Sequence, residues 1–113
     1  MKQIAVIIFL FLGSCQTAWD RYDESLYASV FEPNPNTYEQ HIRSIEALAS
    51  GATPPPGLCA EMAFYLALSG REGEADLWLQ RELEHWPESA KVVHGIHALV
   101  NPDSEKPLAE DAQ

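Results

Sequence analysis

The sequence is poor in basic side chains. It holds 7 lysine and arginine residues against 17 aspartate and glutamate residues, which gives a formal net charge of −10. A surface this acidic repels phosphate groups, so binding to nucleic acid and direct binding to anionic lipid headgroups are both disfavoured. With 113 residues the chain holds one small domain at most.

A long apolar run is also missing. The N-terminal run Ile4–Leu12 is far shorter than the roughly 20 residues that span a membrane. With Lys2 before it, the run predicts a signal peptide over residues 1–14. The run ends in Leu12-Gly13-Ser14-Cys15, which resembles the lipobox of bacterial lipoproteins. We therefore expect Cys15 to carry the lipid (palmitate among the acyl chains); the alternative is an ordinary secretory signal whose cleavage site happens to contain cysteine.

The residues after the lipidation site predict the location. Gln16 stands where aspartate would retain a lipoprotein in the inner membrane. We therefore expect an outer-membrane lipoprotein facing the periplasm, provided that the source is a diderm bacterium. Residues 15–18 form a lipid-anchored linker that reaches only about 10 to 15 Å, so the domain lies against the membrane.

Two helices are predicted in the central stretch Pro56–Ser89. The segment Leu58–Leu68 has Glu61 as its one charge, so this helix must be covered on nearly all faces. Ser69-Gly70 ends it. The next segment shows an apolar stripe at helical spacing, formed by Ala75, Trp78, Leu79, Leu83 and Trp86. Together they predict an antiparallel helix hairpin.

Three further helices are predicted around this hairpin. Trp19–Phe31 carries Tyr22, Leu26 and Val30 at helical spacing. The next helix begins at Asn36 as N-cap, with Glu39 completing a capping box, and ends at Ser50-Gly51. The inner stripe of this second helix is Tyr38, Ile42, Ile45, Leu48 and Ala49. The last helix is predicted over Ala90–Val100, with an apolar stripe of Val92, Val93, Ile96 and Leu99. The fold class is therefore all-α, with about five helices over residues 19–100 and a disordered acidic tail over 101–113.

The hairpin resembles a tetratricopeptide (TPR) repeat. Ala63, Gly70, Ala75 and Pro87 match its small, turn, small and proline positions. Two residues depart from the pattern, because Cys59 replaces a large aromatic and Glu82 replaces a small residue between the helices. We expect Glu82 either to turn to the hairpin's edge or to pair with a base such as Arg43 or Arg21.

Three stretches of the mature region resemble a family of short bacterial lipoproteins that is described by a domain of unknown function and carries TPR-like helices. They are RYDESLY, PPGLCAEMAFYLALSG and RELEHWPES, within residues 19–100. The resemblance implies an envelope assembly shared with a lipoprotein similar to the curli-secretion channel and with another small lipoprotein.

No residue pattern predicts catalysis, a metal site or a cofactor. Glu82 and His85 make one Glu-x-x-His step, whereas a di-iron bundle needs two; His94 and His97 are expected on a surface or between helices. The serines lie in no nucleophile-and-base setting. Cys59 is expected to be a buried free thiol, with an intermolecular disulfide as the alternative.

These observations predict a protein–protein interaction subunit, an adaptor or stabiliser of an envelope or surface-secretion assembly. We expect partners to bind a shallow apolar patch at Ala60, Phe64, Ala67 and Leu68, bordered by the last helix and by acidic residues. Alternatives are an activator of a peptidoglycan synthase, disfavoured by the short linker, and, in another class, a small hydrolase or metalloprotein.

Overall fold

A computed structural model describes residues 17–51 and 53–103. Within these residues the chain forms five α-helices, one short 3₁₀ turn and no strand, so the predicted all-α class is confirmed. The elements are α2 (Ala18–Phe31), α3 (Pro35–Ala49), α4 (Leu58–Leu68), α5 (Glu72–His85), the turn η1 (Pro87–Ser89) and α6 (Ala90–Val100). The predicted signal peptide, Cys15 and all but the first three residues of the predicted tail lie outside the described residues.

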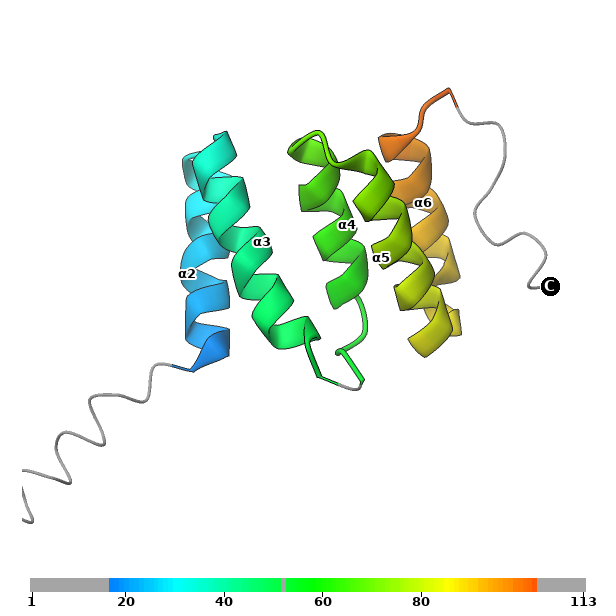
Figure 1. The fold of residues 1–113 in the computed structure, drawn as a ribbon, viewed down its shortest axis with the longest axis horizontal. Coiled ribbons are helices and arrows are strands. Elements are labelled where there is room, and N and C mark those ends of the chain that lie inside the picture. Colours follow the sequence, from blue (N-terminus) through cyan, green and yellow to red (C-terminus); the bar gives the residue numbers. More distant parts are fainter. Residues whose placement is uncertain (1–16, 52, 104–113) are drawn as a thin grey trace, which may run out of the picture.

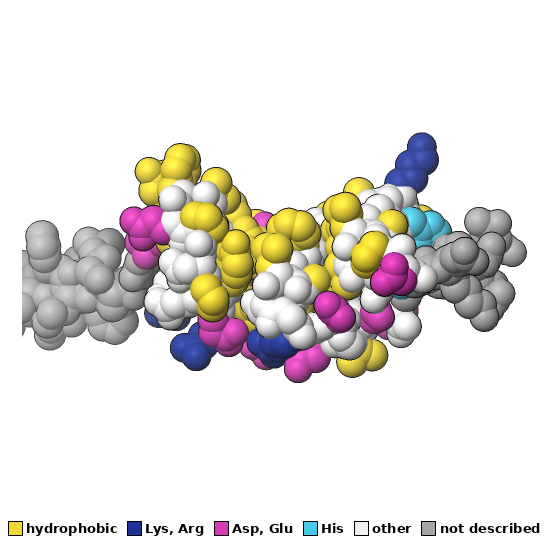
Figure 2. Space-filling model, turned by 90° about the horizontal axis from the view of Figure 1, so that it is seen from above, with side chains coloured by type: hydrophobic (Ala, Val, Ile, Leu, Met, Phe, Trp, Pro, Cys, Tyr) yellow, Lys and Arg dark blue, Asp and Glu magenta, His cyan; other side chains and the backbone are white. Residues whose placement is uncertain are grey.

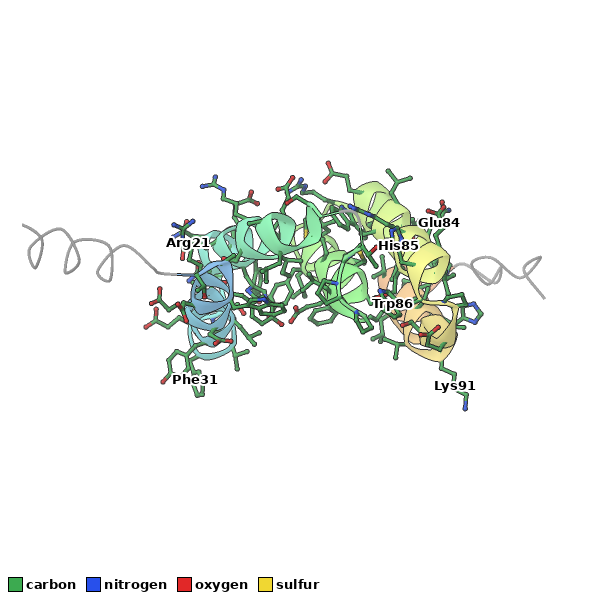
Figure 3. The ribbon with its side chains drawn as sticks, turned by 90° about the horizontal axis from the view of Figure 1, so that it is seen from below. Arg21, Phe31, Glu84, His85, Trp86 and Lys91 are labelled. Carbon is green, nitrogen blue, oxygen red and sulfur yellow. The ribbon has the colours of Figure 1, made fainter. Side chains whose placement is uncertain are left out.

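The helices run alternately up and down, in chain order, with α4 in the middle (Figure 1). Each helix packs on its neighbour in the sequence, and α6 also packs on α4. Seen from above, the molecule is hollowed along one side (Figure 2). Phe31 of α2 and Lys91 of α6 mark the two edges of that side, while α3 and α5 lie opposite (Figure 3). We call this side the hollowed face.

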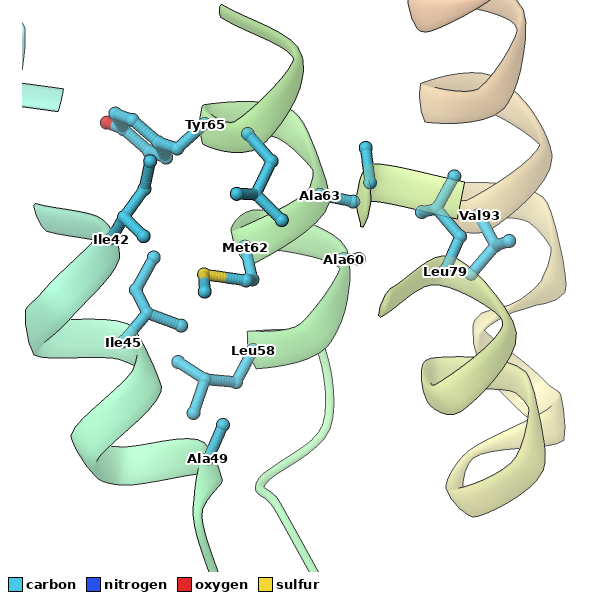
Figure 4. Close-up of a cluster of buried hydrophobic side chains, with 12 residues drawn as sticks. Ile42, Ile45, Ala49, Leu58, Ala60, Met62, Ala63, Tyr65, Leu79 and Val93 are labelled. Atoms are coloured by element: carbon cyan, nitrogen blue, oxygen red, sulfur yellow. The ribbon is translucent and has the colours of Figure 1, made fainter. Parts of the chain in front are cut away.

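The hydrophobic core surrounds α4. Seven of the eleven residues of this helix are buried, which matches the expectation that it must be covered on nearly all faces. From the other helices the core takes Ile42 and Ile45 of α3, Leu79 of α5 and Val93 of α6 (Figure 4). Burial of each such side chain contributes about 1.5 to 3 kcal/mol, so α4 holds both halves of the domain together.

The helix ends follow local capping chemistry. Thr17 caps α2 in a capping box with Asp20. The predicted start of α3 at Asn36 with Glu39 is wrong: Asn34 is the N-cap, and its side chain accepts from the amide of Thr37. The physical reason is that Pro35 suits the first position of a helix, where its missing N–H would have had no partner anyway.

Two predicted apolar stripes are partly wrong. In α2 the buried residues are Ser25 and Ser29, while Val30 is exposed. In α6 Val93 and His97 are buried, whereas Val92 is exposed. Ser25, Ser29 and His97 can be buried beside apolar residues such as Val93 because they find hydrogen-bonding or charged partners on neighbouring helices, which a hydrophobicity pattern does not register.

The hairpin turn at residues 69–70 is as expected. Gly70 has a φ of 77°, in the left-handed region that favours glycine. Its amide donates to the carbonyl of Ala67, and the amide of Arg71 donates to that of Leu66. No helix in the described part of the chain is both long and apolar enough to cross a membrane.

Candidate functional site

Large apolar side chains remain exposed on several helices. They include Tyr27, Val30 and Phe31 of α2, Phe64 and Leu68 of α4, and Leu99 of α6. Hydrophobic side chains gather along the hollowed face, as Figure 2 shows. Folded monomers rarely expose contiguous apolar surface without a binding role. The hollowed face is therefore the candidate functional site.

A cavity of about 350 Å³ lies between the ends of α4 and α6 and the start of α5. Its lining is mostly apolar: Phe64, Ala67, Leu68, Glu72, Leu99, Val100 and Pro102. We call it the apolar cavity. The volume is at the lower end of the ~300 to 1,000 Å³ that ligand pockets occupy, so it suits one or two side chains rather than a large cofactor.

Three of the four residues predicted to bind a partner line this cavity. Phe64 is 39% exposed, Leu68 is 47% exposed, and Ala67 is half-buried between them. Ala60 differs, because it is 1% exposed and packs in the core. Ala60 lies one turn before Phe64 on the same side of α4, but there the other core helices cover it, so its side chain is out of a partner's reach.

A second cavity, of about 510 Å³, adjoins the first and shares Glu72, Val100 and Pro102 with it. Asn101 and Asp103 complete its lining, so we call it the acidic cavity. The Asn101 amide donates to Asp76 Oδ1 over 3.1 Å, which ties the end of α6 to α5.

A buried polar layer joins α2, α3 and α4 on the other half of the molecule. Tyr22 donates to both carboxylate oxygens of Glu61, at 2.8 and 2.6 Å. His41 is fully buried; its Nε2 lies 3.6 Å from Glu61 Oε1, and its Nδ1 lies 2.8 Å from Ser25 Oγ. The layer continues through Ser29 and Tyr65, whose hydroxyls are 2.7 Å apart.

The order Ser25, His41, Glu61 superficially follows the serine, base and acid of hydrolases. The chemistry does not follow, because Ser25 is 7% exposed and its hydroxyl donates to the carbonyl of Tyr22 at 3.0 Å. Burial, followed by the hydrogen bond to Glu61, raises the pKa of Tyr22 well above its usual value, so this phenol stays protonated and serves as a donor. The layer therefore orients three helices.

The predictions for Glu82 are wrong. Its side chain is 0% exposed, so it does not lie at the hairpin's edge, and neither oxygen has a hydrogen-bond partner of good geometry within the described residues. Arg43 pairs instead with Glu39 at 3.8 Å, and the carbonyl of Arg21 accepts from a serine of α3.

The start of α4 explains where Glu82 goes. Gly57 precedes this helix and supplies no side-chain cap; the amide of Leu58 donates to the carbonyl of Pro55 at 3.3 Å, and the helix start favours negative charge. Burial raises the pKa of Glu82, while the amides of Gly57 and Ala60 oppose that rise. The carboxyl thus faces the uncapped end of another helix, which no pattern within α5 could reveal.

Cys59 lies in the same region and is fully buried. Burial, followed by the charge of Glu82, raises the pKa of its thiol to about 11, with Arg81 opposing. A thiol that stays protonated is a poor nucleophile.

The histidines singled out in the sequence do not converge. His97 Nε2 lies 3.9 Å from Asp76 Oδ1, across the interface of α6 and α5. His85 Nδ1 lies 3.2 Å from the carbonyl of Arg81. Among residues 17–51 and 53–103, no group of three or more histidine, cysteine, aspartate or glutamate side chains could hold a metal ion.

Residues 18–96 match the family model described as "Domain of unknown function (DUF4810)". The chain belongs to the DUF4810 family. No curated protein and no solved structure matches the chain. The matched DUF4810 region runs from the first residue of α2 into α6 and includes the α4 side of the apolar cavity, whereas Leu99, Val100 and Pro102 follow it.

Sequence reasoning missed two parts of this DUF4810 domain. The buried polar layer had a signal, because Glu61 is the one charge of an apolar helix and His41 falls on the same face as Ile42 and Ile45. The acidic cavity was predicted only as an acidic border of the patch, without its residues, because Glu72 and Asp103 meet only when α5 and α6 are packed.

Proposed function

We propose that the chain is an outer-membrane lipoprotein, anchored through Cys15 and facing the periplasm, that serves as a protein–protein interaction subunit. In this proposal it is an adaptor or stabiliser of an envelope or surface-secretion assembly that contains a curli-channel-like lipoprotein. Its helix pairs act in the manner of TPR-like hairpins, which bind segments of other proteins on the surface that stacking leaves open.

The observation that carries the proposal is the exposed apolar surface around the apolar cavity. Leu99 is 74% exposed, and it shares a cavity with Phe64 and Leu68. In the polar layer, Ser25 and His41 are buried away from this surface, and Tyr22 is bonded to Glu61. An apolar surface beside buried polar groups supports recognition of a partner rather than turnover of a small substrate.

The sequence supports the membrane part of the proposal. A lipid at Cys15 would place Thr17, the cap of α2, two residues from the anchor. Two or three acyl chains give stable anchoring where one does not. The helical domain then faces its partners at the membrane surface.

Site-specific photo-crosslinking in native membranes tests the proposal. A photoreactive phenylalanine analogue at position 64 is compared with the same analogue at position 77, because Leu77 is 65% exposed on α5 but lines neither cavity. We expect position 64 alone to crosslink a discrete partner, which mass spectrometry identifies as an envelope protein. Equal crosslinking at both positions, or none at position 64, contradicts the proposed binding face. Recovery of the Cys15→Ser variant in the membrane fraction contradicts the anchor.

A further inference from the structure

The two cavities form one continuous depression that changes character along its length. One end is apolar, between Phe64 and Leu99. The other end carries the carboxylates of Glu72 and Asp103, both on exposed residues. Within the described part of the chain, neither carboxylate makes an ion pair or hydrogen bond. The depression therefore offers an apolar contact and a negative charge side by side.

Several features keep the acidic end negative. Glu72 is the first residue of α5, where the helix dipole favours a carboxylate. The nearest cation in the sequence, Arg71, is engaged by Glu39 and Glu74. Helices α4 and α6 both end at the edge of the molecule where α5 begins (Figure 1), and helix C-termini carry partial negative charge. The two C-terminal ends oppose the partial positive charge at the start of α5, so the two carboxylates give this end of the depression its negative charge.

We infer that this depression binds a basic amphipathic segment of another protein, with an apolar side chain in the apolar cavity and a neighbouring lysine or arginine at Glu72 and Asp103. The inference rests on the proposed function and names the chemistry of its partner. A guanidinium or ammonium can pair with both carboxylates while the adjacent apolar residue displaces water from Phe64, Leu68 and Leu99.

Charge argues against the other occupants. A second copy of the chain brings another formal net charge of −10. Residues 104–113 of the same chain carry three acidic side chains and one basic one. Anionic lipid headgroups are repelled for the same reason. A basic segment is the occupant whose charge complements the acidic end.

Binding of two matched peptides tests the inference. The probes are short amphipathic helical peptides, one built from leucine and lysine and the other from leucine and glutamate, each labelled for fluorescence anisotropy. The purified full-length chain should bind the lysine peptide at least about tenfold more tightly than the glutamate peptide. The preference should fall in about 1 M salt, where the screening length is roughly 3 Å.

Matched variants separate the two ends of the depression. Leu99→Ala should weaken binding of the lysine peptide about tenfold, whereas Leu77→Ala, a control at a similarly exposed leucine, should leave it unchanged. Glu72→Gln with Asp103→Asn should weaken it about fivefold, whereas Glu84→Gln on the same helix should not. Glu72→Lys with Asp103→Lys should reverse the preference toward the glutamate peptide. Circular dichroism shows whether each variant keeps its helical content, and only folded variants are compared.

Each contrary outcome has a distinct meaning. If position 64 crosslinks an envelope partner but neither peptide is preferred, the inference fails and the proposed function stands. A dimer that forms at high concentration and is lost in Leu99→Ala assigns the face to a second copy and overturns the inference. If removal of residues 104–113 tightens the binding of both peptides equally, the cavity is assigned to the chain's own tail. That result also overturns the inference.

Discussion

The buried carboxyl of Glu82 should make the domain less stable as the pH rises. In the folded chain its pKa is raised from the ordinary value of 4.5, because burial disfavours the charged form more than the amides of Gly57 and Ala60 favour it. The folded state therefore holds this proton more tightly than the unfolded state does. The contribution is fully present below about pH 4.5 and is lost as the pH rises through the folded-state pKa.

The Glu82→Gln variant isolates this effect, since glutamine has a similar size and cannot ionise. Between about pH 4.5 and the folded-state pKa, the free energy of unfolding of the parent should fall relative to the variant by up to about 1.4 kcal/mol per pH unit. For a domain of this size, 1 kcal/mol shifts the melting temperature by about 4 to 8 °C. The NH2 group of the glutamine would face backbone N–H groups, which cannot accept a hydrogen bond from it. The resulting loss of stability does not depend on pH. The slope with pH is therefore the measured quantity, rather than the absolute difference.

Urea unfolding followed by far-UV circular dichroism at about pH 5, 6 and 7 measures that slope. Glu84→Gln is the matched control, because Glu84 is an exposed residue of the same helix. The control should follow the parent at every pH. A parent that gains stability relative to Glu82→Gln as the pH rises, or a gap that does not change with pH, would show that the carboxyl is solvated or paired in the folded chain.

Three further predictions concern the helix caps, the thiol and the polar layer. Asn34→Ala should cost about 1 kcal/mol, from the lost bond to the amide of Thr37, whereas Asn36→Ala should cost little; thermal melting compares them, and equal losses would contradict the cap. In the Cys15→Ser variant, which leaves Cys59 as the one thiol, labelling by a thiol reagent should be slow in buffer and fast in urea, and rapid labelling of the folded chain would refute the burial. Tyr22→Phe should cost about 1.5 to 3 kcal/mol by removing the donor to Glu61, whereas Tyr27→Phe should be near neutral in the same urea titration; a neutral Tyr22→Phe would mean that water replaces the phenol.

Local patterns placed the bounds of two helices correctly and the start of a third wrongly. The bounds Leu58–Leu68 and Ala90–Val100 agree with the structure because apolar periodicity, glycine and proline act within a few residues of the chain. Two asparagines could cap α3, and the prediction chose Asn36 where the structure has Asn34. Asn36 looked like a cap because Glu39 follows it, but the fixed φ of Pro35 sets the first turn two residues earlier.

The other wrong predictions share one cause, which is contact between residues that are far apart in the sequence. Glu82 was predicted to lie at the hairpin's edge or to pair with a basic side chain, and its carboxyl faces the start of α4 instead. The predicted stripe of α2 included Val30, whereas Ser25 and Ser29 are buried because His41 and Tyr65 meet them from other helices. Polar partners of this kind become visible only when the helices are packed, whereas the exposed Phe64 and Leu68 belong to one helix of one hairpin and could be predicted from it alone.

The chain order of the helices has a consequence for how the domain folds. In the described part of the chain, no helix packs against one more than two places away along the sequence. Short sequence separation between contacting residues lowers the loop-closure entropy that must be lost early, and helical domains of this kind fold in about microseconds to milliseconds. The pair α2 and α3 nevertheless cannot complete its interior by itself, since the acceptor for Tyr22 and the hydroxyl that meets Ser29 both come from α4. We therefore expect α4 to form the nucleus, with the first two helices collapsing onto it as one late step and α5 and α6 as another.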